Sequence, residues 1–260
     1  MISLTVIARN AEETLARCLA SAAWVDEKIV VDSGSTDRTL EIARAAGAKV
    51  YERAWEGYSS QKNYAIDQAK GDWIISLDSD EWLTEELSRE LKERLTSSKT
   101  QAGWQAPMKT YYFGKWLQHG GFWPDYHLRV FRRMAGRSVA KEKEVHEGFH
   151  VEGSVGDLTH PIGHEAYPNL YGYIQKFNRY TTLEAEGWVR AERPLYGYDM
   201  LIRPMHRWIK RYGIQGGWRD GAEGLLACSL AAAYEWVVAL KVYERRPVNG
   251  VKLLTTLFKR

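Results

Sequence analysis

The first half of the chain alternates short apolar runs with amphipathic segments, and this pattern predicts strands that alternate with helices. Buried strands are predicted at 4–8, 28–32, 48–51 and 72–77, and helices at 12–23, 36–47, 61–69 and 84–95. In the first helix the apolar residues recur at helical spacing, as in Leu15, Cys18, Leu19 and Ala22. Repeated strand–helix units with short connections favour a parallel α/β sheet that is covered by helices.

Polar residues follow three of these strands at the point where each strand ends. Arg9 follows the first strand, Asp32 ends the second, and Asp78-Ser79-Asp80 follows the fourth. Right-handed crossovers place the carboxyl ends of parallel strands at one edge of a sheet, where ligands of such sheets bind. The sequence therefore predicts one polar crevice at this edge.

The pattern changes at about residue 100. Strands are predicted at 104–109 and 128–132, on either side of a loop rich in glycine and aromatic residues, and helices follow at 170–186, 195–212 and 220–244. We therefore expect an α/β domain over residues 1–165 and a helical C-terminal extension over residues 166–260.

Composition narrows the class of protein. With 45% apolar and 27% charged residues the chain is globular, and a net charge of +3 is too small to indicate a nucleic-acid partner. The two cysteines, Cys18 and Cys228, lie far apart in apolar helical patterns, which favours reduced structural thiols.

Two features bear on the membrane. The chain begins with a strand rather than with the basic start of a signal peptide, and Glu235 interrupts the most apolar stretch, 224–240, so we expect a cytoplasmic protein without a transmembrane span. Basic residues are interleaved with aromatic ones at 203–212 and near the C-terminus. Such segments suit diphosphates, acidic glycolipids or a membrane surface, and ordinary solvated surface is the alternative.

Asp78-Ser79-Asp80 is an Asp-x-Asp sequence directly after an apolar strand. Alternate residues of an extended segment point the same way, so the two carboxylates can face one hard cation, which prefers oxygen ligands. Such a cation would bridge the oxygens of a diphosphate. The alternative interpretation is an acidic start of the following helix.

Two other nucleotide-binding motifs are missing. No Gly-x-Gly-x-x-Gly follows the first strand, and the chain has no phosphate loop with Gly-Lys-Ser or Gly-Lys-Thr, so dehydrogenases and phosphate-loop enzymes lack support. Asp32 is suited to accept hydrogen bonds from a ribose or a base. The alternative for the segment that follows it is a plain turn before a helix.

These motifs, taken in order, resemble glycosyltransferase family 2, which has the GT-A fold: a Rossmann-like, mostly parallel sheet flanked by helices. The later motifs are similar to those of a small bacterial branch that includes transferases of the lipopolysaccharide inner core. The segments that carry the resemblance are 6–12, 29–37, 75–81, 120–125, 128–133, 145–148 and 217–221. The Gln-x-x-Arg-Trp motif of processive members is missing, so polymer synthesis is not expected.

The resemblance implies a role for each matching donor-site residue. Asp32 and the backbone near Ala8 and Arg9 would bind the uracil or the ribose, Lys62 and Asn63 would flank the base, Asp78 and Ser79 would lie beside the ribose, and Asp80 would bind Mg²⁺ or Mn²⁺ together with Asp78. Arg129 could reach the diphosphate, since its planar fork suits phosphate, and an ion pair at the sheet edge is the alternative.

The resemblance also implies a general base that takes a proton from the acceptor hydroxyl. Glu147 is the first candidate, with a surface partner of Lys141 or Lys143 as the alternative role, and Asp125 is the second. His164 could complete the metal shell or contact a phosphate, and His146 and His160 compete with it for this role.

We therefore expect an inverting, metal-dependent hexosyltransferase. Its donor would be a UDP-sugar, UDP-glucose first, and its acceptor a glycolipid or sugar, such as a heptose of the lipopolysaccharide core. The helical segments would make peripheral contact with the inner face of the inner membrane. One alternative is an inactive module that binds a nucleotide sugar or carbohydrate. The other is a nucleotidyltransferase, which normally has a basic glycine-rich loop after its first strand.

Overall fold

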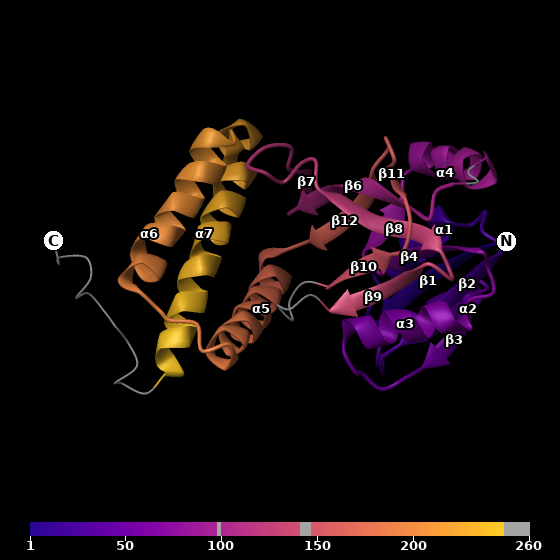
Figure 1. The fold of residues 1–260 in the computed structure, drawn as a ribbon, viewed down its shortest axis with the longest axis horizontal. Helices are drawn as coiled ribbons and strands as arrows, with labels where there is room; N and C mark the ends of the chain where they lie inside the picture. Colours follow the sequence, from indigo (N-terminus) through magenta and orange to yellow (C-terminus); the bar gives the residue numbers. More distant parts are fainter. Residues whose placement is uncertain (98–99, 141–146, 247–260) are drawn as a thin grey trace. The chain divides into compact units, whose positions relative to one another are not determined.

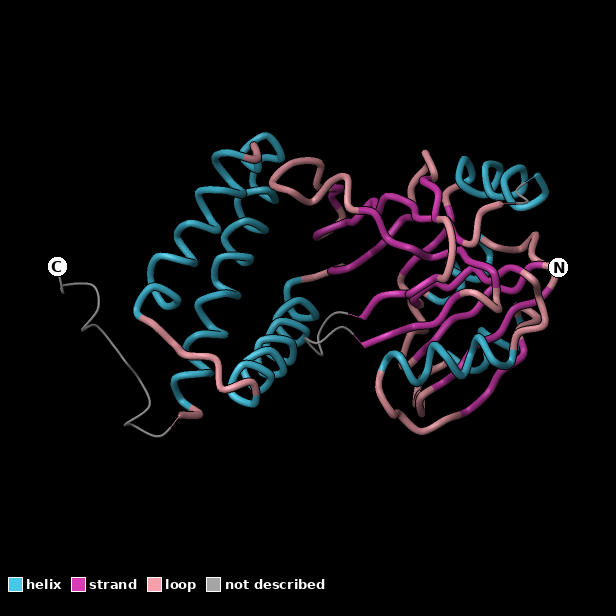
Figure 2. Tube along the Cα trace, viewed as in Figure 1, coloured by secondary structure: helices cyan, strands magenta, loops and turns pink. Residues whose placement is uncertain are grey.

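The computed structural model describes residues 1–97, 100–140 and 147–246 (Figure 1). The chain divides into two compact units. The first, which we call the sheet unit, comprises residues 1–110, 124–141 and 147–166. The second, the helical unit, includes residues 111–123 and the chain from Tyr167 onward. Figure 2 shows that strands dominate the first unit and helices the second.

The sheet unit contains a mixed sheet whose strands follow the order β3-β2-β1-β4-β8-β6-β12-β5. Strands β1 to β4 pair in parallel, whereas β8 joins β4 in the antiparallel sense. β11 also pairs with β6, and β7, which belongs to the helical unit, pairs with Tyr111 and Tyr112 at the end of β6. The strands are β1 (Ile2–Ala8), β2 (Glu27–Asp32), β3 (Lys49–Glu52), β4 (Trp73–Asp78), β5 (Glu81–Leu83), β6 (Gly103–Tyr112), β7 (Lys115–Trp116), β8 (Tyr126–Arg132), β11 (Val155–Asp157) and β12 (Ile162–Tyr167).

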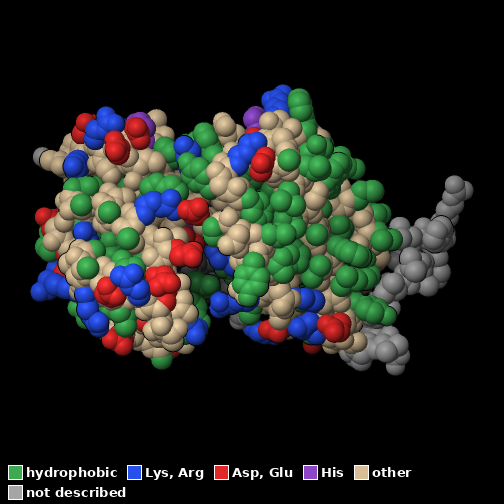
Figure 3. Space-filling view, turned by 180° about the vertical axis from the view of Figure 1, so that it is seen from behind, with side chains coloured by type: hydrophobic (Ala, Val, Ile, Leu, Met, Phe, Trp, Pro, Cys, Tyr) green, Lys and Arg blue, Asp and Glu red, His purple; other side chains and the backbone are tan. Residues whose placement is uncertain are grey.

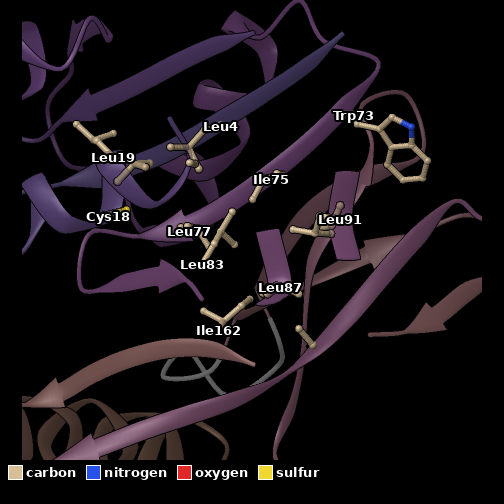
Figure 4. Packing of buried hydrophobic residues seen from close by; sticks show 14 of the residues in the cluster. Leu4, Cys18, Leu19, Trp73, Ile75, Leu77, Leu83, Leu87, Leu91 and Ile162 are labelled. Atoms are coloured by element: carbon tan, nitrogen blue, oxygen red, sulfur yellow. The ribbon is translucent and has the colours of Figure 1, made fainter. Parts of the chain in front are cut away.

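Helices cover both faces of this sheet because its central strands are apolar on both sides. On one face Leu4, Val6 and Ile75 pack against three helices, α1 (Leu15–Ser21), α2 (Thr39–Ala45) and α4 (Glu85–Ser97). Figure 4 shows this cluster, with Leu19 of α1 and Leu87 and Leu91 of α4 pointing into it.

The opposite face carries the residues that alternate with these. Ile7, Ile29 and Ile74 pack there against Ala65 and Ile66 of α3 (Tyr58–Gln68). A separate two-stranded hairpin, β9 (Gly136–Ala140) and β10 (Glu147–Val151), lies beside α3. Both polar atoms of the Asn63 side-chain amide bind this hairpin. Nδ2 donates to the Ser138 carbonyl at 2.9 Å, and Oδ1 accepts from the Ser138 N–H at 2.8 Å.

The helical unit is built from three long helices, α5 (Leu170–Arg190), α6 (Gly197–Trp208) and α7 (Gly221–Glu244). A π-helical segment, η1 (Ile209–Ile214), and a short 3-10 helix, η2 (Gly217–Asp220), join α6 to α7. Its apolar core is small and consists of Ala185, Trp188, Leu195, Val238, Ala239 and Val242.

The predicted fold class, an α/β sheet flanked by helices and followed by a helical extension, is confirmed. The four predicted strands of the first half are present, although the first helix covers only Leu15–Ser21. The prediction was incomplete after residue 80, where it missed β5, β7, the β9–β10 hairpin, β11 and β12. All of these strands are short, and β5, β11 and β12 pair with segments far away in the sequence, so no local apolar run marks them.

Candidate functional site

Asp78 ends β4, and two cations hold its carboxylate. Lys62 Nζ of α3 lies 2.8 Å from Asp78 Oδ1, and an Arg129 guanidinium nitrogen of β8 lies 3.2 Å from Oδ2. Partial burial raises the pKa of Asp78, but Lys62 and then Arg129 outweigh this and hold the pKa well below its usual range. Asp78 is therefore a fixed negative charge at the carboxyl end of the sheet.

Glu81 fixes the turn that carries the Asp-x-Asp sequence. It is 1% exposed, and it accepts two hydrogen bonds from Arg129, at 2.9 Å from Nε and 2.7 Å from the terminal nitrogen. It also accepts the Asp78 N–H at 3.1 Å. Sequence reasoning missed this role, since Glu81 appeared only as the last residue of a motif. In this structure Arg129 forms ion pairs at the sheet edge, as the alternative to phosphate binding proposed. A contact between Arg129 and a diphosphate stays a prediction.

The pairing of β5 with β12 brings His164 to Asp80. In this register His164 lies opposite Glu81, and the Glu165 N–H donates to the Asp80 carbonyl at 3.0 Å. His164 Nε2 is 3.7 Å from Asp80 Oδ2, and both side chains are about one-quarter exposed, at 26% and 24%. Burial lowers the pKa of His164, but Asp80 outweighs burial, and the pKa is raised.

Asp80 and His164 have the right chemistry to hold a divalent cation, with an oxygen and a nitrogen donor that can turn toward one ion. The described residues contain no group of three or more His, Cys, Asp or Glu side chains that could hold a metal alone. In proteins Mg²⁺ is commonly bound by one or two carboxylates and takes its other ligands from substrate phosphates and water, and binding of such an ion by Asp80 stays a prediction.

The loops after β1 and β2 are hydrogen-bonded to each other, and β1 lies next to β4, the strand that Asp78 ends. Ala8 and Asp32 are partners in the β1–β2 register. Asp32 is 1% exposed and accepts the N–H groups of Gly34 and Ser35 at 2.9 and 2.8 Å. Its carboxylate thus shapes the turn that follows β2. Contact of Asp32 with a base or a ribose remains a prediction, as does that of the exposed Arg9.

The other predicted residues are spread more widely. Asn63 binds the backbone of Ser138, so its amide positions the β9–β10 hairpin. Asp125 is exposed at the start of β8, and its Oδ2 lies 2.9 Å from His127 Nε2. His160 pairs with Glu90 of α4, with 2.9 Å between His160 Nδ1 and Glu90 Oε2. The intermediate exposure of Ser79 places it at the surface of the Asp-x-Asp turn.

Part of the segment around Glu147, the first candidate for the general base, lies outside the described residues. Glu147 is the first residue of β10, and its backbone pairs with Ala140, but its side chain is not among the described atoms. Lys141, Lys143 and His146 are also outside them. The structure therefore brings together Lys62, Asp78 and Arg129, with Asp80 and His164 alongside, and leaves the choice of base as a prediction.

The sequence of this chain is similar to those of sugar transferases. The model of glycosyl transferase family 2 matches residues 3–146, more than half of the 260 residues. The lipopolysaccharide core biosynthesis glycosyltransferase LpsC of Rhizobium meliloti (strain 1021) is 32% identical over 257 residues, and the match covers 96% of this chain and 94% of that protein.

Two further likenesses are partial or distant. A TPR repeat-containing protein of Synechococcus elongatus is 47% identical over 103 residues, which cover 39% of this chain and 26% of that protein. Among solved structures, residues 1–349 of TarS from S. aureus align over 94% of this chain and 90% of that one, with a TM-score of 0.46 and 14% identity.

Proposed function

The chain belongs to glycosyl transferase family 2, and we propose that it moves a hexose from a UDP-sugar, UDP-glucose first, to a sugar acceptor with inversion at the anomeric carbon. The acceptor in this proposal is a sugar of the lipopolysaccharide core, because LpsC, which matches nearly the whole chain, is named for core biosynthesis, and a heptose is the first candidate. The observation that carries the proposal is the arrangement of Asp78 and Asp80 at the end of β4, with Lys62, Arg129 and His164 around them.

Each residue of this strand end has a task in the proposed reaction. Asp32 and the backbone at Ala8 and Arg9 hold the nucleoside, and Asp78 lies beside the ribose. Lys62 and Arg129 keep Asp78 ionised and in place. Asp80 and His164 would hold Mg²⁺ or Mn²⁺, and such an ion would supply positive charge that neutralises the diphosphate leaving group.

The acceptor hydroxyl requires a base, and Glu147 is the first candidate, with Asp125 second. The proton passes to that carboxylate as the hydroxyl oxygen attacks the anomeric carbon. Holding both sugars in a reactive orientation supplies the rest of the proposed rate enhancement. In this proposal the protein acts at the cytoplasmic face of the inner membrane, where lipid-anchored acceptors are reached.

The proposal is tested by measuring UDP release and sugar transfer with purified heptose-terminated core oligosaccharide and a panel of UDP-hexoses. We expect transfer from one donor, a loss of about a hundredfold or more in Asp80→Asn, and little change in the surface control Glu85→Gln. Binding of UDP-sugar without turnover by any acceptor would favour the inactive binding module instead. Pyrophosphate release from a sugar phosphate and UTP would favour a nucleotidyltransferase.

A further inference from the structure

Asp80 and His164 lie at a short strand pairing in the sheet unit. Asp80 stands between β4 and β5, and His164 belongs to β12. β5 has three residues, lies at the end of the strand order and pairs with β12 at three positions. A pairing of this length is marginally stable by itself. The separation of the two side chains therefore depends on what packs against β5 and β12.

Arg17 of α1 contacts both strands of this pairing. Its guanidinium carbon lies 3.7 Å from the centroid of the Trp82 ring in β5, and a terminal nitrogen of the same group pairs with Glu165 in β12. A planar guanidinium can stack on an aromatic ring and pair with a carboxylate at the same time. One side chain of α1 thus fastens β5 to β12.

Both partners of Arg17 adjoin the predicted cation ligands. The Trp82 ring packs so closely on Gly163, the residue before His164, that a methyl group at Gly163 would stand 2.1 Å from it. The Glu165 N–H, on the other side of His164, donates to the Asp80 carbonyl at 3.0 Å. A shift of Trp82 or Glu165 would therefore move the backbone that carries His164 and Asp80.

Two further side chains of α1 hold the same turn from the same helix. The Cys18 thiol donates to the Asp78 carbonyl, with 3.6 Å between sulfur and oxygen. The Ser21 hydroxyl accepts the Leu83 N–H at 3.0 Å. Helix α1 therefore contacts the chain both before and after Asp80, and Arg17 extends this support to β12.

The place of the Arg17–Glu165 pair matters more than its charge. Ion pairs are common on the sheet unit, where Figure 3 shows basic and acidic side chains next to one another. The Arg17 and Glu165 side chains are 44% and 28% exposed, and pairs at such exposure contribute little to stability. Replacing a residue that orients metal ligands, in contrast, typically lowers metal affinity by roughly ten- to a hundredfold.

We propose that Arg17 is a positioning residue for the cation site. It stacks on Trp82 and pairs with Glu165, and it thereby holds β5 and β12 so that Asp80 and His164 reach one divalent ion. The inference rests on the proposed function, because it concerns the Mg²⁺ or Mn²⁺ that would hold the donor diphosphate. It assigns to α1 a part in cation binding through the two ligands rather than through contact with the ion.

Calorimetric titration of Mn²⁺ into the full chain at saturating UDP tests this role. Arg17→Ala should weaken Mn²⁺ binding by about tenfold. It should leave the UDP affinity measured without metal unchanged and lower Tm by no more than about 3 °C. Arg17→Lys keeps the charge but not the planar stack, so its Mn²⁺ affinity should lie between those of Arg17→Ala and the wild type.

Glu165 provides a second test of the same contact. Glu165→Gln should also weaken Mn²⁺ binding, and adding it to Arg17→Ala should cause little further loss, because the two changes remove one interaction. The matched control is Arg44→Ala, which breaks an exposed ion pair with Glu52, 3.5 Å long, between α2 and β3. Its Mn²⁺ and UDP affinities should equal those of the wild type.

Two results would overturn the positioning role alone. One is Mn²⁺ binding by Arg17→Ala as tight as by the wild type. The other is an equal loss of UDP affinity with and without Mn²⁺, which would indicate a general structural role. A wild type whose UDP affinity does not respond to Mn²⁺ would instead contradict the proposed use of a cation, and the role of Arg17 would fail with it.

Discussion

Arg129 and Glu81 form a nearly buried ion pair with two hydrogen bonds, and this pair supports the turn on which the predicted metal ligand stands. Glu81 also accepts the Asp78 N–H, so one carboxylate ties β8 to the backbone at the end of β4. The position of Asp80 therefore depends on a residue that does not belong to the Asp-x-Asp sequence.

Replacing Glu81 by glutamine should be costly for this reason. Glu81→Gln leaves the nearly buried Arg129 guanidinium with only the partly exposed Asp78 as a counter-charge, and we expect the free energy of unfolding to fall by about 3 kcal/mol. Denaturant unfolding monitored by circular dichroism measures this change. Glu85→Gln, at the exposed first turn of α4, is the matched control. A Glu81→Gln protein as stable as the wild type would show that the pair contributes nothing net.

The close contact between β5 and β12 predicts that a side chain at Gly163 destabilises the protein. Gly163 lies opposite Trp82, and a methyl group on it would stand 2.1 Å from the indole ring. Gly163→Ala should therefore shift Trp82 and destabilise the protein by about 1–3 kcal/mol. It should also weaken UDP binding, because the same pairing places His164 beside Asp80.

Gly187 provides the control for this change. It lies inside α5, and nothing would stand within 4 Å of an added methyl group. Gly187→Ala should therefore stabilise the protein by about 0.5–1 kcal/mol, since alanine favours the helix. Thermal unfolding of the two variants should shift in opposite directions, and shifts in the same direction would contradict the argument.

The hydrogen bonds of Glu27 predict how the free energy of unfolding depends on pH. Burial raises its pKa, but hydrogen bonds from Lys49, the Lys70 N–H and Ser3 outweigh burial and lower the pKa. A carboxyl with a lower pKa in the folded state stabilises the protein above its unfolded pKa, and this contribution is lost as the pH falls through the folded value. Glu27→Gln should destabilise the protein at pH 7 by about 1–3 kcal/mol and flatten the decline of stability below about pH 5.

The exposed Glu13 is the control for that experiment. Glu13→Gln should leave both the stability at pH 7 and the shape of its acid dependence close to those of the wild type. Urea titrations at several pH values measure both quantities. An unchanged acid dependence in Glu27→Gln would show that Glu27 does not govern it.

The choice of base can be decided by two substitutions. If Glu147 takes the proton, Glu147→Gln should lower kcat by about a hundredfold to ten-thousandfold while leaving the affinity for UDP unchanged. Asp125→Asn should then have a small effect. The reverse pattern would assign the base to Asp125, and a small effect of both would exclude the two candidates together.

The sequence predicted those parts of the molecule whose signal is local. The apolar runs of β1, β2 and β4 and the helical spacing in α7 can be recognised from residues close together in the chain. The strand end that carries Asp78 and Asp80 followed from the order of strands and helices.

The partners of polar side chains could not be predicted in this way. The family resemblance places Asn63 beside the base of the nucleotide, but in the fold its amide binds Ser138, which is 75 positions away. Glu81 meets Arg129 only because β8 joins the sheet next to β4. Both contacts join residues that are far apart in the sequence, so no periodic pattern around either residue marks them.

The central claim is that Asp80 helps to bind a divalent cation that holds the diphosphate of the donor, and calorimetric titration of UDP with and without Mn²⁺ tests it most directly. We predict that Mn²⁺ strengthens UDP binding by about tenfold or more in the wild type, and that Asp80→Asn removes this gain while remaining folded. UDP affinity that is the same with and without Mn²⁺ in the wild type, or a gain that persists in Asp80→Asn, would contradict the claim.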